Sequence, residues 1–225
     1  MGTVTILDQT TRAPISLIGQ MAGVCWGADT TDTEKNYKRG LNCLESGHGR
    51  TFEFPDVYME LNGYSAWVMR EWYTHIGGMP TRLQASTRYI DYGAFEYVTP
   101  PSIAKDKDAL ECYQDAMAML AQDIKWLVED AGIPREDAAL LLPLGMTTRV
   151  VCKHNLRNLI DMSRQRMCNR AYWEYQSLFF KLGKALCEYS SEWAEIVTRQ
   201  FKSKCDVLGY CPEKHGCGQY PRRGE

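Results

Sequence analysis

The spacing of hydrophobic and polar positions predicts both strands and helices along the chain. Residues 3–7 alternate with a period of two, which is typical of a strand, and further strands are expected at 57–61 and 146–152. Residues 106–130 carry an apolar stripe with a period of 3.6, the pattern of a helix that buries one face. Gly132 follows this stripe and is a typical helix end. Strands and helices therefore both contribute to the fold.

Start and stop residues add further helices in the first third of the chain. A proline opens residues 14–26 and favours a helix there, because proline is tolerated at a first helical position. Thr33 is the expected cap of a second helix, which ends at Gly47. Asn62-Gly63 is a strong turn signal, and helical character follows it over 64–75. We therefore expect two helices before the second strand and one after it.

The second half of the chain is predicted to be mainly helical. Pro100-Pro101 marks a loop before the long apolar stripe. Asn155 is the expected cap of a helical region that continues to Phe201. Breaks in this region are expected near Gly183 or Ser190-Ser191.

Together these elements predict one α+β domain over residues 1–201, followed by a Cys-, Gly- and Pro-rich tail over 202–225 that need not pack. A chain of 225 residues can bury about 70–75% of its unfolded surface, so the core needs no disulfides or structural metals to be stable. The formal charge of −2, from 26 basic and 28 acidic residues, argues against a nucleic-acid binder. No apolar run approaches the roughly 20 residues of a membrane span, and the N-terminus lacks an export signal. We therefore expect a cytoplasmic protein with no membrane partner.

Two common nucleotide-binding motifs are missing from the sequence. The chain has neither G-x-G-x-x-G after a predicted strand nor G-x-x-x-x-G-K-[ST], so a bound nucleotide would need arginines to hold its phosphates. Arginines are concentrated in residues 149–170. On the predicted helix, Arg157 and Arg164 share one face, and Arg166 and Arg170 share another. A solvated basic face and an anion site both explain this grouping.

Several short motifs occur in the order and spacing of one known family. Residues 47–53 resemble the G-H-x-x-x-x-E segment of the flavin-dependent thymidylate synthases, and residues 84–89 resemble the end of that family's signature, [EQ]-x-S-x-R-Y. Segments similar to the later motifs of the family are Pro100-Pro101-Ser-Ile, Leu142-Pro143-Leu, residues 155–159 and residues 166–174. The resemblance covers about residues 40–180.

This resemblance implies an α+β subunit that binds FAD and assembles as a homotetramer. It further implies that a one-carbon unit passes from methylenetetrahydrofolate to C5 of dUMP, with NADPH as the reductant. Reduced flavin supplies a hydride on this route, so no cysteine nucleophile is needed. By the family pattern, Arg166 would sit against the uracil and stabilise its ionised N3–O2 edge.

The resemblance also assigns binding residues, each of which has an ordinary structural role as its alternative. The substrate-binding residues would be Glu71, Gln84, Ser86 and Arg88. The cofactor-binding residues would be His48, Arg50, Glu53, Thr74, His75, Gln84, Asn155, Arg157 and Asp161. No residue is assigned to a metal.

The chain departs from the family pattern near the expected nucleotide site. Thr74-His75-Ile76 stands where the family has R-H-R, and two extra residues lie within 77–82. A family arginine is replaced by Ala139. One hypothesis is that Arg82 or Arg149 supplies the missing charge and binds the substrate. The alternatives are a divergent flavoenzyme acting on another pyrimidine nucleotide, and a catalytically silent homologue that binds nucleotide or metal.

The nine cysteines fall into two groups. Cys205, Cys211 and Cys217 lie in the tail together with His215, and these four soft ligands either bind zinc or form a reduced, redox-sensitive tail. The other six cysteines are scattered through the chain and are expected to pack as small buried hydrophobic residues.

Overall fold

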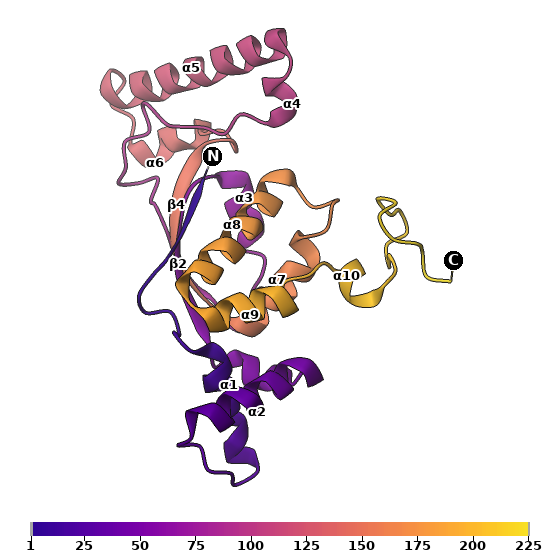
Figure 1. Ribbon diagram of the computed structural model, residues 1–225. Helices are drawn as coiled ribbons and strands as arrows, with labels where there is room; N and C mark the ends of the chain where they lie inside the picture. The colour runs from indigo at the N-terminus through magenta and orange to yellow at the C-terminus, as the bar shows by residue number, and fades with distance from the viewer. Residues whose placement is uncertain (1, 225) are drawn as a thin grey trace. The chain divides into compact units, whose positions relative to one another are not determined.

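The computed structural model describes residues 2–224 (Figure 1). It contains helices and a four-stranded sheet in the order β1-β2-β4-β3. The strands are β1 (Thr3–Ile6), β2 (Asp56–Ser65), β3 (Thr81–Gln84) and β4 (Thr147–Asn155). The mixed helix and sheet composition predicted from the sequence is confirmed, and β3 is a strand that the pattern did not predict.

Contacts along the chain group it into two compact units, which are described one at a time. The smaller unit consists of residues 2–3, 61–74 and 83–151, and the larger unit consists of residues 4–60, 75–82 and 152–224. The helices of the smaller unit are α3 (Ala66–Trp72), α4 (Pro101–Ala104), α5 (Lys107–Glu129), α6 (Arg135–Ala138) and the short η2 (Ala139–Leu141). The helices of the larger unit are α1 (Pro14–Cys25), α2 (Thr33–Ser46), the short η1 (Gly49–Glu53), α7 (Leu156–Arg166), α8 (Trp173–Tyr189), α9 (Ser191–Gln200) and α10 (Lys204–Leu208). None of the helices in the described part of the chain is long and apolar enough to cross a membrane.

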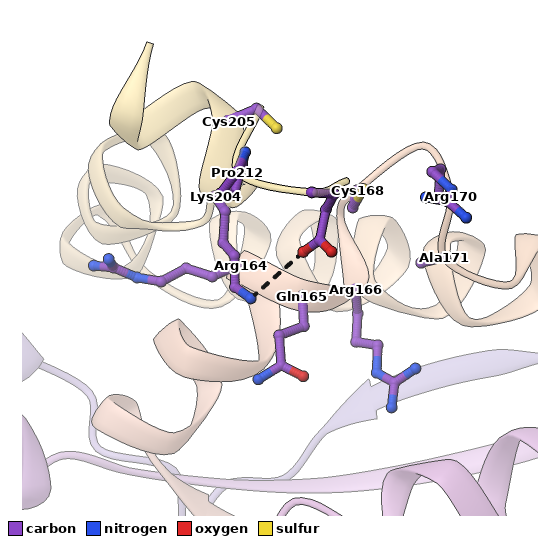
Figure 2. A pocket seen from close by; sticks show the side chains of 10 residues that line it. Arg164, Gln165, Arg166, Cys168, Arg170, Ala171, Lys204, Cys205 and Pro212 are labelled. Carbon is purple, nitrogen blue, oxygen red and sulfur yellow. Dashed lines mark ion pairs between the residues drawn. The ribbon is translucent and has the colours of Figure 1, made fainter. Parts of the chain in front are cut away.

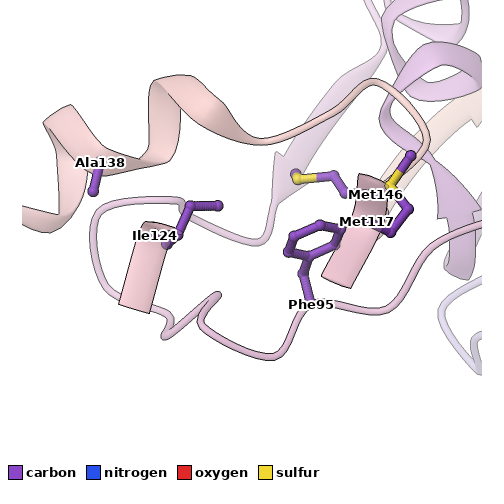
Figure 3. Packing of buried hydrophobic residues seen from close by; sticks show 5 residues of the cluster. All are labelled: Phe95, Met117, Ile124, Ala138 and Met146. Carbon is purple, nitrogen blue, oxygen red and sulfur yellow. The ribbon is translucent and has the colours of Figure 1, made fainter. Parts of the chain in front are cut away.

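Helix α5 lines a buried apolar cluster of the smaller unit. Asp106 caps this helix by accepting a hydrogen bond from the Ala109 amide at 3.0 Å, and Gly132 follows its end with a φ of 69°. The cluster consists of Phe95, Met117, Ile124, Ala138 and Met146 (Figure 3). The stripe predicted over 106–130 therefore buries one face of the helix, as its period indicated.

Helices α1 and α2 of the larger unit approach each other closely. A Cβ atom on Gly19 would lie 1.8 Å from the Asn36 carbonyl oxygen, and one on Gly40 would lie 1.9 Å from the Ile15 carbonyl oxygen. Both contacts are with backbone, which cannot rotate aside. Glycine is therefore required on both helices at this crossing.

Helices α7, α8 and α9 supply the main core of the larger unit. Trp193 of α9 is fully buried, and its Nε1 donates a hydrogen bond to the Thr11 carbonyl oxygen at 2.7 Å. The other buried side chains on these helices include Leu156, Leu159, Tyr175, Phe179, Leu182 and Ile196. This packing fixes α7, the helix that carries Arg157, Arg164 and Arg166, against α8.

Two local predictions in the first half of the chain are wrong. Asn62-Gly63 forms no turn, because β2 continues to Ser65, and Gly63 takes a φ of 73° within the strand. A left-handed glycine is as compatible with an irregular strand as with a tight turn, so the signal was ambiguous. Pro101, expected in a loop, begins the short helix α4, where a first-position proline is tolerated.

One predicted helix cap is wrong, and of the two alternative breaks predicted after residue 155, the one at Ser190-Ser191 is confirmed. Asp32 rather than Thr33 caps α2, because its carboxylate reaches the Lys35 amide at 3.0 Å. Gly183 lies buried within α8, and the break falls at Ser190, whose hydroxyl caps α9.

A further break, which was not predicted, follows Arg166 and separates α7 from α8. Arg170 therefore lies in the connecting turn. The prediction that Arg166 and Arg170 share a helix face is wrong for this reason.

The residues after 201 are folded rather than loosely attached. Helix α10 begins with a capping box in which the side chains and amides of Ser203 and Asp206 exchange hydrogen bonds. Asn169, in the turn after α7, donates a hydrogen bond to Gln219 at 2.6 Å. These contacts give the tail local structure, although most of its residues are exposed.

The scattered cysteines follow the packing prediction only in part. Cys43 and Cys152 are buried, but Cys25, Cys112 and Cys187 are exposed. These three lie on the solvent-facing sides of α1, α5 and α8, where a small side chain has no core to fill. The core role predicted for them is wrong.

Candidate functional site

The start of α7 supports a neighbouring loop of the larger unit. Asn155 caps the helix, as predicted, by accepting a hydrogen bond from the Asn158 amide at 2.9 Å. The loop glycines pack against this cap. A Cβ atom on Gly78 would lie 2.3 Å from Nδ2 of Asn155, and Gly78 has a φ of 73°. The segment with two extra residues is thus held against the start of α7 at a position that requires glycine.

The predicted catalytic residue, Arg166, lies at the other end of α7 and is held by two side chains. Its Nε donates a hydrogen bond to Nε2 of His75 at 3.1 Å. Its guanidinium carbon lies 4.5 Å from the centre of the Tyr175 ring, a cation–π distance. The rings of His75 and Tyr175 meet edge to face, with centroids 6.2 Å apart. The three side chains form one cluster.

The imidazole of His75 is neutral at physiological pH. Burial, together with the positive charges of Arg166 and Arg82, lowers the pKa of His75 to about 4. A neutral imidazole has one nitrogen without a proton, and the contact with Arg166 makes that nitrogen Nε2. His75 is therefore a hydrogen-bond acceptor toward the arginine.

Arg82 links the two ends of the segment 75–82 by a contact with His75. Its Nη2 donates a hydrogen bond to the His75 carbonyl oxygen. His154 lies nearby on β4 and contacts Asn158 at 2.5 Å through Nδ1. Burial lowers the pKa of His154 to about 4, and Arg82 and His75 lower it further against the opposing hydrogen bond. Two neutral histidines thus lie beside two arginines in this part of the larger unit.

A second group of predicted residues lies where η1 meets the start of α7. Glu53 forms an ion pair with Arg157 at 2.6 Å and a longer one with Arg50 at 3.7 Å. His48, at the start of η1, is exposed, as is most of the Arg50 side chain. The structure therefore brings these predicted flavin-binding residues together and leaves their donors accessible to an anion. Asp161 is exposed further along α7.

The remaining predicted residues belong to the smaller unit. Gln84 ends β3, and its amide donates a weak hydrogen bond to Thr148 at 3.4 Å. Ser86 follows in a turn, where its hydroxyl accepts a hydrogen bond from the Arg88 amide at 3.2 Å. The Arg88 guanidinium pairs with Glu136 at 2.7 Å on the surface. The three residues therefore lie close together along the chain, and Arg88 carries a carboxylate partner.

Glu71 and Thr74 occupy the end of α3 in the smaller unit. The Thr74 hydroxyl donates a hydrogen bond to the Glu71 carbonyl oxygen at 2.7 Å, which completes the last turn. This contact gives Thr74 a local structural role. Its predicted role in flavin binding, and that of Glu71 in substrate binding, stay predictions.

Sequence reasoning missed Tyr175 as part of the site. The residue follows the A-Y-W-E run of the family-like motif after Arg166, and an aromatic residue at that spacing was the available signal. Its place beneath the guanidinium depends on how α8 returns past α7, which no local pattern contains.

A pocket of about 360 Å³ lies beside this site in the larger unit, between the end of α7, the turn that follows it and the tail (Figure 2). Its lining residues are Arg164, Gln165, Arg166, Cys168, Arg170, Ala171, Lys204, Cys205, Pro212 and Glu213. Lys204 and Glu213 form an ion pair at 4.0 Å across it. Figure 2 shows that the Arg166 side chain extends away from Cys205 and Pro212. The tail therefore lines the pocket, and the arginine's charge is directed away from the tail.

The tail cysteines are near one another. Burial and a hydrogen bond with Cys211 raise the pKa of Cys205 to about 11, and the neighbouring Cys168 and Cys217 raise it further. All nine cysteines are free thiols. Within residues 2–224, no three His, Cys, Asp or Glu side chains are grouped so that they could hold a metal ion. The structure thus adds Cys168, from the turn after α7, to the cysteines that the tail brings together.

Comparison with known proteins agrees with the motif pattern. Residues 5–189 match the family described as Thymidylate synthase complementing protein. The flavin-dependent thymidylate synthase of Nitratidesulfovibrio vulgaris is 33% identical over 80% of this chain and 75% of its own length. The flavin-dependent thymidylate synthase of Pyrococcus furiosus is 28% identical over 95% of this chain and 91% of its own length.

A solved structure has the same fold. The flavin-dependent thymidylate synthase of Helicobacter pylori, complexed with FAD and dUMP, superimposes with a TM-score of 0.65 at 20% identity, covering 86% of this chain and 98% of that one. The family match extends over most of the sequence, so the chain belongs to the thymidylate synthase complementing protein family. The resemblance inferred from the motifs is confirmed.

Proposed function

We propose that this protein is a flavin-dependent thymidylate synthase that reductively methylates dUMP to dTMP, with methylenetetrahydrofolate as carbon donor and NADPH as reductant. The observation that carries this proposal is the fixed guanidinium of Arg166, at the motif position where the family binds uracil. Family membership and relatives named for this activity support it.

The residues around η1 and the start of α7 fit FAD. An exposed arginine, a second arginine half-exposed beside it, an exposed imidazole and a helix cap suit a ligand with a pyrophosphate and a polar ring edge. Arg50 and Arg157 would hold phosphate oxygens, and His48 and Asn155 would donate to the remaining polar atoms. When bound, FAD carries the hydride that reduces the transferred one-carbon unit.

Arg166 would act on the nucleotide. A guanidinium against the N3–O2 edge of uracil would stabilise the ionised form of the base, whose negative charge makes C5 a better nucleophile toward the one-carbon unit. Because the arginine is already oriented by His75 and Tyr175, no reorganisation is needed when the substrate arrives. Removal of one such preorganised donor costs about 10²–10³ in kcat in well-studied enzymes.

The residues of the smaller unit complete the assignment as predictions. Gln84, Ser86 and Arg88 would bind the nucleotide, and Arg88 would exchange its surface partner Glu136 for a phosphate oxygen. That exchange costs little free energy, because exposed ion pairs contribute only about 0–1 kcal/mol to stability.

Absorbance spectroscopy tests the binding part of this proposal. The purified protein is titrated with FAD and then with dUMP, with the Arg166→Ala variant as the matched control. We expect a bound-flavin spectrum that shifts on addition of dUMP, and no dUMP-dependent shift in the variant. A folded protein that binds no flavin would contradict the proposal and leave a silent homologue as the interpretation.

We also propose that the protein assembles as a homotetramer and acts in the cytoplasm. The assembly follows the pattern of the family. Light scattering coupled to size-exclusion chromatography should give four times the subunit mass of 25.7 kDa. A monomeric mass at micromolar concentration, with FAD present, would contradict it.

A further inference from the structure

His75 occupies the one position that survives from the family's R-H-R segment, and the structure gives it an unexpected partner. Its Nε2 accepts a hydrogen bond from Nε of Arg166, 91 residues away in sequence, at 3.1 Å. The contact uses the arginine's Nε. A hydrogen bond at Nε limits rotation of the planar guanidinium, whose terminal nitrogens have the geometry to bind a planar ligand edge.

Tyr175 restricts the same guanidinium from another direction. Cζ of Arg166 lies 4.5 Å from the centre of the Tyr175 ring. The ring is completely buried and stacks on Phe179, also of α8. An arginine held by a hydrogen bond at Nε and by an aromatic face has few orientations left. The pair therefore fixes the direction of the charge as well as its position.

The surroundings of His75 keep its nitrogen available to accept. The groups that face it are Arg166 from α7, Arg82 from β3, His154 from β4 and Tyr175 from α8. None of these carries a negative charge at neutral pH, and two are cationic, so a second proton on the imidazole is unfavourable. Nε2 thus stays an acceptor across the neutral range.

The inserted loop holds His75 in place. Arg82 donates to the His75 carbonyl oxygen, and Gly78 packs against the Asn155 side chain at the start of α7. Between them, Met79 adopts a φ of 52°, a left-handed conformation that is uncommon for methionine. The two extra residues are therefore built into a tight loop whose ends are tied to His75 and to α7.

We infer that His75 is a positioning residue for Arg166: its Nε2 and the Tyr175 ring together orient the guanidinium toward the nucleotide's base. This inference rests on the proposed function, in which Arg166 contacts uracil. This role differs from the flavin contact predicted for His75, because Nε2 of His75 binds Arg166 and not the cofactor.

Three replacements of His75 separate the positioning role from a general structural one. Gln places an amide oxygen about where Nε2 lies, whereas Asn is too short to reach and Leu has no acceptor. Each variant is examined by urea unfolding, by FAD affinity, and by dUMP affinity measured calorimetrically at saturating FAD. We expect His75→Leu and His75→Asn to weaken dUMP binding about tenfold, and His75→Gln to restore most of the loss.

A double-mutant cycle with Arg166→Lys identifies the route of the effect. Lysine has no Nε–H to orient, so in the Arg166→Lys background the His75→Leu change should leave dUMP affinity the same within twofold. Additive losses in the double variant would overturn the positioning role and leave the proposed function intact. So would a loss confined to FAD affinity.

Different results would contradict the proposed function and the positioning role of His75. If Arg166→Lys itself leaves dUMP affinity unchanged, then both the assignment of Arg166 to the nucleotide and the positioning role are wrong. If Arg166→Lys weakens dUMP binding but Leu, Asn and Gln at position 75 behave alike, only the positioning role is wrong.

Discussion

Gly78 is the position where the inserted loop meets the start of α7 most tightly, and its replacement by alanine has a calculable cost. A Cβ atom there would lie 2.3 Å from Nδ2, 2.8 Å from Oδ1 and 2.9 Å from Cγ of Asn155. The clash is with a side chain, so Asn155 would rotate away. In doing so it would lose the hydrogen bond that its Oδ1 accepts from the Asn158 amide at 2.9 Å.

The expected magnitude has two parts. An alanine at a φ of 73° costs about 1–2 kcal/mol in backbone strain. Loss of an Asn cap costs about 1 kcal/mol more. Gly78→Ala should therefore lower the free energy of unfolding by about 2–3 kcal/mol. It should also weaken FAD binding, because the proposal assigns Asn155 to the cofactor.

Gly27→Ala is the matched control, because Gly27 also belongs to the larger unit and has a φ of 59°, but a Cβ there would meet nothing within 4 Å. It should cost only the strain of about 1–2 kcal/mol. The assay is urea unfolding of both variants, of Asn155→Ala and of the double variant Gly78→Ala/Asn155→Ala. In the Asn155→Ala background, the cost of Gly78→Ala should fall to that of the control. Equal costs for Gly78→Ala and Gly27→Ala in the otherwise natural chain would show that the contact between Gly78 and the Asn155 cap does not contribute to stability.

Three further predictions follow from other contacts. Gly40→Ala, which drives a Cβ to 1.9 Å from the Ile15 carbonyl oxygen, should destabilise the protein by about 3 kcal/mol or prevent folding, and a normal melting curve would contradict it. Ser190→Ala should cost about 1 kcal/mol through loss of the α9 cap, measured by urea unfolding, and a cost near zero would remove the hydroxyl from that role. Because His75 and His154 have a pKa of about 4 when folded and about 6.5 when unfolded, the unfolded chain takes up protons first, so stability should fall as pH drops from 6.5 to 4. His75→Gln should make this fall shallower, and identical pH slopes would show that His75 does not contribute.

The sequence predicted the elements whose signals are local. The helix α5 combines a capping aspartate, a continuous 3.6-residue stripe and a terminal glycine, so its limits were predicted to within one residue. Strand β3 has no such signal. Its four residues, Thr-Arg-Leu-Gln, do not alternate clearly, and its strand character comes from pairing with β4, as in the hydrogen bond from the Ala85 amide to the Arg149 carbonyl oxygen.

The candidate site likewise contains residues that sequence motifs predict and contacts that depend on the fold. Motif order identified Arg166, His75 and Asn155, because spacing along the chain is visible in the sequence. The contact between His75 and Arg166 depends on two segments meeting far apart in sequence, and Tyr175 depends on the return of α8 past α7. The local structure of the tail does not follow from its Cys-, Gly- and Pro-rich composition, because it depends on a capping box and on contacts with the turn after α7.

Product analysis with labelled methylenetetrahydrofolate distinguishes thymidylate synthesis from the other flavin chemistries. The protein is incubated with FAD, NADPH and dUMP, and the nucleotides are separated and counted, with Arg166→Ala as the control. We expect labelled dTMP from the natural chain and a loss of about 10²–10³ in rate for the variant. A protein that binds FAD and dUMP but transfers no label to the nucleotide would contradict the account, and would favour a divergent flavoenzyme that acts on another pyrimidine nucleotide.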